Sequence, residues 1–270
     1  MAPYDPPSSP LMPDSPLPRD RSARAAASPA LLFLHGAACG EWVWQQGFAG
    51  ACADAGFAVE ALPFLRQTEE GQAAGLGDYV AQTRAAVDAL SGPERRPVVL
   101  VGHSLGALVA QRLLLEPAIR GAALLSPVPP EGLWFSSTRL ALTDPSLWTE
   151  AVRMEAPAGQ ADPALAGSLF GPEMPAGQAQ RYLAQMGGES RAALLEAQGP
   201  QPVPHGWLHG RPVLVLGAGE DRLIPPDAVH RCALWHGTTA EFMPGMGHLM
   251  MLEPGWPRLA ARLLDWLRRL

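Results

Sequence analysis

Short apolar runs alternate with amphipathic stretches along most of the chain. Apolar runs without alternating polar positions are typical of strands buried on both faces of a parallel sheet, and the longer stretches repeat apolar residues at helical spacing. The pattern predicts an α/β fold with a mostly parallel central sheet and helices on both faces. We predict strands at 30–35, 58–62, 97–101, 121–126, 213–217 and 240–243, and helices at 42–55, 78–90, 105–115, 226–234 and 257–270.

Two segments depart from this alternation. Residues 1–28 are rich in Pro, Ser, Asp and Arg and contain no apolar stretch of the kind found in secretory signals, so we expect a disordered arm there. Residues 127–209 combine aromatic and methionine side chains with short helix-like pieces that Pro and Gly interrupt. The predicted organisation is therefore an arm over 1–28 and one α/β domain over 29–270, with an insertion at about 127–209.

Composition narrows the class of protein. The chain has 270 residues, is 47% hydrophobic and 17% charged, and carries a net charge of −6. An acidic chain of this kind is not expected to bind nucleic acid or an anionic membrane. No stretch approaches the ~20 apolar residues of a membrane span. The three cysteines match neither a disulfide framework nor a metal-binding spacing. We therefore expect a cytoplasmic protein with reduced thiols, no metal and no cofactor.

The strongest chemical signal is a serine between two glycines. The pentapeptide at 102–106 has the pattern G-x-S-x-G with Ser104 at its centre, directly after the third predicted strand and before a predicted helix. In this context the pattern predicts a nucleophile elbow, a sharp turn that exposes the serine hydroxyl. The helix that begins there aims N–H groups and its positive end at a developing anion. We interpret Ser104 as the nucleophile.

Two later segments contain partners for such a serine. Glu220 and Asp221 follow the fifth predicted strand, and His248 lies in a glycine-rich loop after the sixth. A histidine would take the serine proton as general base, and a carboxylate would hold its ring in the required tautomer. Both carboxylates are candidates for this acid. His103, next to the serine, is expected to point to the other side of the elbow.

The order serine, acid, histidine resembles that of the α/β-hydrolase superfamily. The resemblance covers about 30–270 and favours Asp221, because the family carries its acid in a G-x-x-D type loop. It implies a small helical cap inserted after the sixth strand of the family's sheet. The family also begins with a β-hairpin before the strand that ends in His35-Gly36, and only the proline-rich arm precedes that strand here. We therefore expect one or both hairpin strands to be missing.

The same resemblance implies an oxyanion hole. The His-Gly loop supplies one donor in this superfamily and the residue after the nucleophile supplies the other. Mapped onto this chain, the donors are the backbone N–H groups of Ala37 and Leu105. The aromatic side chains that follow the fourth predicted strand, Trp134 and Phe135, together with Leu249 beside the histidine, are the candidates for contacting substrate.

Two runs, at 34–44 and 248–254, are similar to the methylesterase and hydroxynitrile-lyase branch of the superfamily. The lyases place a lysine next to the catalytic histidine, but Leu249 occupies that position, and all 20 basic residues are arginine, which we interpret as the codon bias of a GC-rich bacterial genome. We therefore expect a serine esterase acting on a small to medium apolar carboxylic ester or lactone. A thioesterase or acyl-transfer enzyme, a cofactor-free perhydrolase and a non-catalytic ligand receptor remain alternatives.

Overall fold

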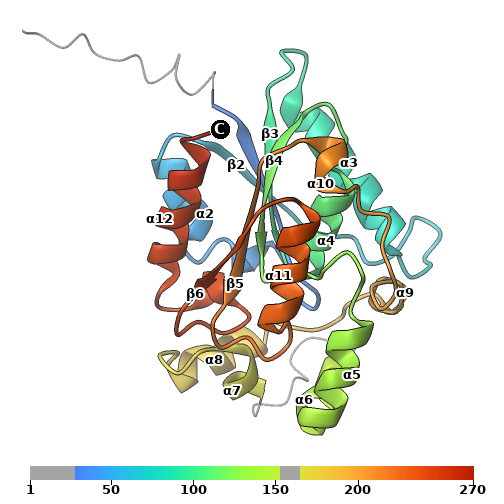
Figure 1. Ribbon diagram of the computed structural model, residues 1–270, viewed down its shortest axis with the longest axis vertical. Helices are drawn as coiled ribbons and strands as arrows, with labels where there is room; N and C mark the ends of the chain where they lie inside the picture. Colours follow the sequence, from blue (N-terminus) through green and yellow to red (C-terminus); the bar gives the residue numbers. More distant parts are fainter. Residues whose placement is uncertain (1–27, 153–164) are drawn as a thin grey trace, which may run out of the picture.

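In the part of the chain that the structure describes, a single sheet of six parallel strands forms the centre (Figure 1). The computed structural model describes residues 28–152 and 165–270, so the predicted arm lies almost wholly outside the described residues. The strand order is β2-β1-β3-β4-β5-β6, which confirms the predicted parallel α/β sheet. The strands are β1 (Ala30–Leu34), β2 (Ala58–Leu62), β3 (Val98–His103), β4 (Ile119–Leu125), β5 (Val213–Ala218) and β6 (Ala240–Met243).

Helices cover both faces of this sheet. One face packs against α3 (Leu76–Ser91), α4 (Leu105–Arg112) and α11 (Pro226–Trp235). The other face packs against α2 (Phe48–Asp54) and α12 (Trp256–Leu267), which lie side by side in Figure 1. Because successive side chains of a strand point to opposite faces, each strand contributes to both cores. Because both faces of the sheet are covered, its inner strands are mainly apolar runs without alternating polar positions.

The predicted helix at 42–55 is wrong in its first half. The structure has a 3-10 turn, η1 (Glu41–Val43), and α2 begins only at Phe48. Gly47 separates the two with a φ of 115°, a left-handed conformation that glycine adopts without a steric penalty. A Cβ atom there would lie 2.7 Å from the ring of Trp256, so the close approach of α12 also requires a glycine.

The described residues between β4 and β5, which we call the helical insertion, fall in the stretch that the sequence sets apart. The insertion follows the fourth strand of the described sheet, because no strand precedes β1 within the described residues. Figure 1 shows α5 to α8 together at one end of the sheet. The insertion contains α5 (Trp134–Thr143), α6 (Pro145–Val152), α7 (Ala166–Leu169), α8 (Ala176–Leu183), α9 (Arg191–Glu196) and α10 (Gly206–His209).

Helix α4 approaches β1 so closely that a side chain does not fit between them. A Cβ atom on Gly106 would lie 2.4 Å from the carbonyl oxygens of Leu34 and His35. We expect Gly106→Ala to lower the free energy of unfolding by about 2–3 kcal/mol, because overpacking forces the backbones apart. Urea denaturation measures this loss. Gly50→Ala in α2, where a Cβ atom meets open space, is the control and should not destabilise; equal stability of both variants would contradict the close approach.

Candidate active site

Ser104 occupies a strained turn between β3 and α4. Its φ of 51° and ψ of −115° lie in a region that residues with a side chain rarely adopt, at a cost of about 1–3 kcal/mol. The two flanking glycines make the turn possible. A Cβ atom on Gly102 would lie 2.6 Å from the backbone of Ala107, and Gly106 has no more room on the β1 side. The hydroxyl therefore stands at the start of α4 with small neighbours on both sides.

His248 and Asp221 lie together at the ends of β6 and β5. His248 Nδ1 donates to Asp221 Oδ2 at 2.8 Å. The other carboxylate oxygen accepts the N–H groups of Leu223 and Ile224, each at 2.9 Å. With its proton on Nδ1, the neutral ring leaves Nε2 as an acceptor. No hydrogen bond links Ser104 to His248 among the described residues, and such contacts are often loose before substrate binds.

The electrostatic balance keeps Asp221 ionised. Burial alone would raise the pKa of this carboxyl group, but the charge of a protonated His248, the hydrogen bond from that ring and the N–H of Ile224 together lower it. The rival acid Glu220 has an exposed side chain, and the structure brings Asp221, not Glu220, to the histidine.

The structure contradicts the expected orientation of His103. Its ring lies 4.7 Å from the ring of His248, and its Nε2 donates to the backbone carbonyl of His248 at 2.9 Å. Burial lowers the pKa of His103 to about 3, so the ring stays neutral. His103 thus ties the serine turn to the histidine loop. The sequence places it next to Ser104 but carries no sign of a contact 145 residues away.

Glu253 supports the histidine loop from the other side. This buried carboxyl group accepts the N–H of Gly247, the residue before His248, at 2.9 Å. The same oxygen accepts the N–H of Gly171 in the helical insertion at 2.6 Å. Burial raises the pKa of Glu253. No sequence pattern marks this residue, because its contacts are with two backbone groups that only the fold brings together.

The two residues predicted to supply the oxyanion donors lie at the same pocket as Ser104. Ala37 and Leu105 both line the pocket at the serine, and no hydrogen bond uses their backbone N–H groups among the described residues. Two free N–H groups near a nucleophile can bind an anionic oxygen. Cys39, in the same loop as Ala37, is buried, and burial raises the pKa of its thiol to about 12, so it stays protonated and unreactive.

A cavity of about 690 Å³ opens at these groups. Its wall combines the serine and histidine with mostly apolar side chains from α5, α6 and α9. Trp134 and Leu249, two of the three residues predicted to contact substrate, line it. Phe135, the third of these candidates, is not part of the wall.

Within 28–152 and 165–270, no three side chains of His, Cys, Asp or Glu are grouped so that they could hold a metal ion. In the same ranges, each helix is too short or too polar to cross a bilayer.

Comparison with known proteins places these features in a family. The model of the Alpha/beta hydrolase family matches residues 31–260. No protein of curated function matches the sequence. The solved structures that resemble this one include a monoacylglycerol lipase from Paleococcus ferrophilus, with 17% identity, a TM-score of 0.61 and coverage of 89% of this chain and 95% of the lipase.

Two further solved structures have the same fold. The esterase RhEst1 from Rhodococcus sp. ECU1013 is 20% identical, with a TM-score of 0.63 and coverage of 90% of this chain and 91% of the esterase. The methylesterase protein MES16 from Arabidopsis is 17% identical, with a TM-score of 0.65 and coverage of 90% and 100%. At these identities the likeness concerns the fold, whereas the family model spans most of the sequence. The chain belongs to the alpha/beta hydrolase family.

Proposed function

We propose that the protein is a serine hydrolase that cleaves a small to medium apolar carboxylic ester or lactone. The observation that carries the proposal is the meeting of Ser104, His248 and a largely apolar cavity at the carboxyl ends of the strands. Its fold relatives include proteins named as an esterase, a lipase and a methylesterase, which supports the same class of reaction.

The reaction follows from the roles of these groups. His248 Nε2 takes the proton of Ser104 as Oγ attacks the ester carbonyl, and the N–H groups of Ala37 and Leu105 stabilise the oxyanion that forms. The proton then passes from His248 to the leaving alkoxide as the C–O bond breaks, which leaves an acyl group on Ser104. Water, deprotonated by His248, hydrolyses this acyl-enzyme and restores the serine. Asp221 holds the ring throughout.

The helical insertion acts as a cap over the nucleophile in this proposal. Its helices α5, α6 and α9 supply aromatic and aliphatic side chains to the cavity wall, which favours an apolar acyl or alcohol group. Leu249 is buried beside His248, where a cyanohydrin lyase of the related branch would carry a lysine, so cyanohydrin cleavage is disfavoured.

A chain-length series tests the function. With p-nitrophenyl esters from acetate to decanoate, we expect kcat/KM to rise with each methylene by up to about fourfold, the equivalent of ~0.8 kcal/mol of burial, until the cavity is full. Acyl-coenzyme A donors and mandelonitrile are run beside the esters. Thioester turnover far above that of every oxygen ester would replace the esterase with a thioesterase or acyl-transfer enzyme, and cyanide release would restore the lyase.

Trp134 and Phe135 form a matched pair for the same series. Trp134→Ala removes part of the cavity wall, so kcat/KM for the longer esters should fall by roughly fivefold, about 1 kcal/mol for an aromatic side chain that stays partly exposed. The adjacent Phe135→Ala should leave the series as in the wild type, because that side chain lies outside the wall. An equal loss in both variants would show that α5 does not contact substrate in this way.

A further inference from the structure

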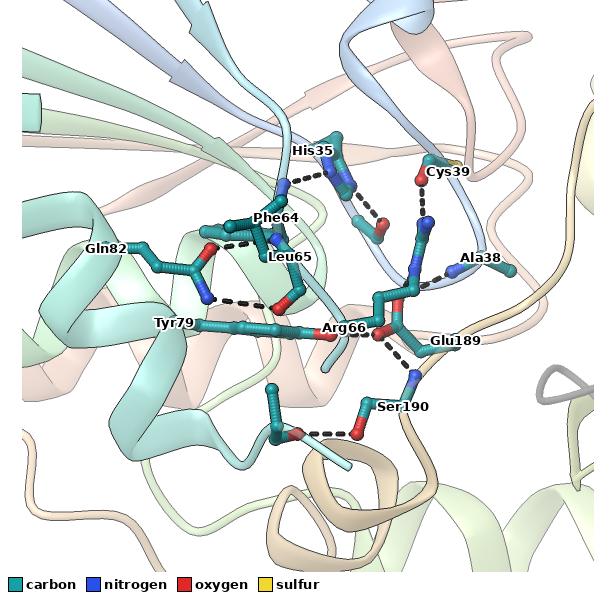
Figure 2. Close-up of polar contacts among 12 residues, drawn as sticks. His35, Ala38, Cys39, Phe64, Leu65, Arg66, Tyr79, Gln82, Glu189 and Ser190 are labelled. Carbon is teal, nitrogen blue, oxygen red and sulfur yellow. Dashed lines mark hydrogen bonds and ion pairs between the residues drawn. The ribbon is translucent and has the colours of Figure 1, made fainter. Parts of the chain in front are cut away.

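A buried carboxylate from the helical insertion accepts a hydrogen bond from the loop that contains Ala37 (Figure 2). Glu189, in the helical insertion between α8 and α9, is only 4% exposed. Its Oε2 accepts the backbone N–H of Ala38 at 3.0 Å. Its Oε1 accepts the hydroxyl of Tyr79 at 2.5 Å and the N–H of Ser190 at 2.8 Å. Both oxygens therefore accept hydrogen bonds, and one of them is bound to the residue after Ala37.

Arg66 completes the contact from the other end of the loop. Its Nη2 donates to the carbonyl of Cys39, and its Nε lies 3.7 Å from Glu189 Oε2. The ion pair thus binds the loop at two points: Glu189 accepts the N–H of Ala38, and Arg66 donates to the carbonyl of Cys39, as Figure 2 shows. A third bond, from the N–H of Gly187 to the carbonyl of Ala38 at 2.9 Å, joins the loop to the same segment of the insertion.

These contacts hold a loop that is strained by itself. Ala38 has a φ of 58°, a left-handed conformation that a residue with a side chain rarely adopts. Such a conformation persists only where its surroundings impose it. The N–H and the carbonyl of Ala38 are both bound to the insertion, by Glu189 and Gly187. The strained turn is therefore maintained by residues about 150 positions later in the chain.

The direction of the Ala37 N–H follows from the two peptide planes that flank it. The carbonyl of Gly36 accepts His35 Nδ1 at 2.8 Å and the N–H of Cys39 at 3.3 Å, and this fixes the plane that contains the Ala37 N–H. The next plane, between Ala37 and Ala38, is fixed by Glu189. With both planes fixed, the N–H of Ala37, a residue that lines the pocket containing Ser104, has one direction.

We infer that Glu189 is a positioning residue for the oxyanion hole: its carboxylate, held by Arg66 and Tyr79, sets the direction of the Ala37 N–H. The inference rests on the proposed function. It makes the helical insertion a part of the catalytic frame as well as a wall of the cavity. Glu189 touches neither substrate nor the reacting atoms, so its effect must be seen in the rate of the chemical step.

Glu189→Gln and Glu189→Ala test this inference. An amide has one acceptor oxygen, so Gln cannot receive the N–H of Ala38 and the donors on Oε1 together. We expect kcat for the best p-nitrophenyl ester to fall by roughly 10- to 100-fold in both variants, with KM changed by less than about threefold, because the lost interaction acts in the transition state. Glu196→Gln is the control. That carboxylate also accepts a backbone N–H, from Leu76 at 2.7 Å, but does not touch the loop.

A thionoester gives a readout that general destabilisation does not move. Sulfur accepts hydrogen bonds weakly, so thionoester hydrolysis depends little on the oxyanion N–H groups. The ratio of the ester rate to the thionoester rate should therefore fall in the Glu189 variants and stay constant in Glu196→Gln. Tyr79→Phe, which removes one donor to Glu189 and keeps the ring that stacks on Phe64, should show the same changes at about three- to tenfold. It carries the test if the Glu189 variants do not fold.

Two outcomes separate this inference from the proposed function. A folded Glu189→Ala protein with the kcat and rate ratio of the wild type would overturn the inference and leave the esterase in place. A wild-type protein that hydrolyses no ester would overturn the function. In that case, amide hydrogen exchange at residues 36–39 still tests the contact: exchange must be faster in Glu189→Ala than in the wild type and in Glu196→Gln, and equal exchange would contradict the role of Glu189.

Discussion

Ser104→Ala is expected to lower kcat/KM for p-nitrophenyl esters by roughly 10⁴-fold or more and to abolish labelling by a fluorophosphonate probe. Removal of the nucleophile eliminates the covalent route, and the residual rate comes from binding and the oxyanion donors alone. Alanine takes the strained main-chain conformation of Ser104 at a similar cost, so the variant should fold as the wild type does. Mass spectrometry of the wild type should find the probe on the peptide that contains Ser104.

Ser137→Ala is the matched control for this experiment. Ser137 lines the same cavity, but its hydroxyl donates to Gln198 at 2.9 Å and has no base beside it. We expect this variant to keep its labelling and most of its turnover. Undiminished labelling of Ser104→Ala would show that another residue is the nucleophile. Ester binding without turnover or labelling in the wild type would instead indicate a ligand receptor built on this fold.

The free energy of unfolding is expected to fall by about 4 kcal/mol between pH 7 and pH 5. Burial lowers the pKa of His103 and of His236 to about 3 each, whereas an unfolded histidine titrates near ~6.5. Below pH ~6.5 these two histidines bind protons in the unfolded chain but remain neutral in the folded protein. Each ring then costs about 1.4 kcal/mol of stability per pH unit, and the contribution is complete above pH ~6.5.

Hydrogen bonds to both ring nitrogens of His236 explain why the ring does not take up a second proton. The N–H of Arg211 donates to His209 Nδ1 at 2.9 Å, so His209 must donate from Nε2 to His236 Nδ1, at 3.1 Å. His236 Nε2 then donates to the side-chain oxygen of Gln111 at 3.1 Å. A proton added to either ring would place two donors face to face. The chain of bonds therefore holds only while both rings are neutral.

Urea denaturation at several pH values measures this dependence. Burial also lowers the pKa of His35, which adds to the slope, while the raised pKa of Glu253 works against it near pH 5. His236→Gln should reduce the slope by about 1.4 kcal/mol per pH unit. His230→Gln, at an exposed position of α11, the helix that ends just before His236, is the control and should leave the slope unchanged. Stability that stays constant from pH 7 to pH 5 would contradict the burial of neutral rings.

The parts of the fold that depend on local pattern were predictable. The strands at 58–62 and 240–243 have the predicted bounds, and the serine turn lies where the glycine pattern puts it. The late start of α2 was missed, because it depends on a glycine facing the ring of Trp256 on another helix. A sequence pattern can indicate where the chain turns, but it does not show which distant residue the turn contacts.

The same distinction applies to the candidate site. The positions of Ser104, Asp221 and His248 could be predicted because each lies at the end of a strand, and parallel strands end at one edge of the sheet. Glu189 and Glu253 could not be. Their partners are backbone N–H groups, which every residue but proline carries, so no sequence pattern marks the contact.

The contacts of Glu189 and Glu253 set limits on the exchange of segments between members of the family. A chimaera that replaced the whole helical insertion to change substrate range would remove the acceptor for the Ala38 N–H and alter the Gly171 contact of Glu253. Such a graft would disturb the catalytic loops while leaving every catalytic side chain in the sequence. A chimaera should therefore exchange only α5 and α6, which line the cavity. Residues 187–190 should be kept from the same parent as the sheet, although they lie far from the β1 loop in the sequence.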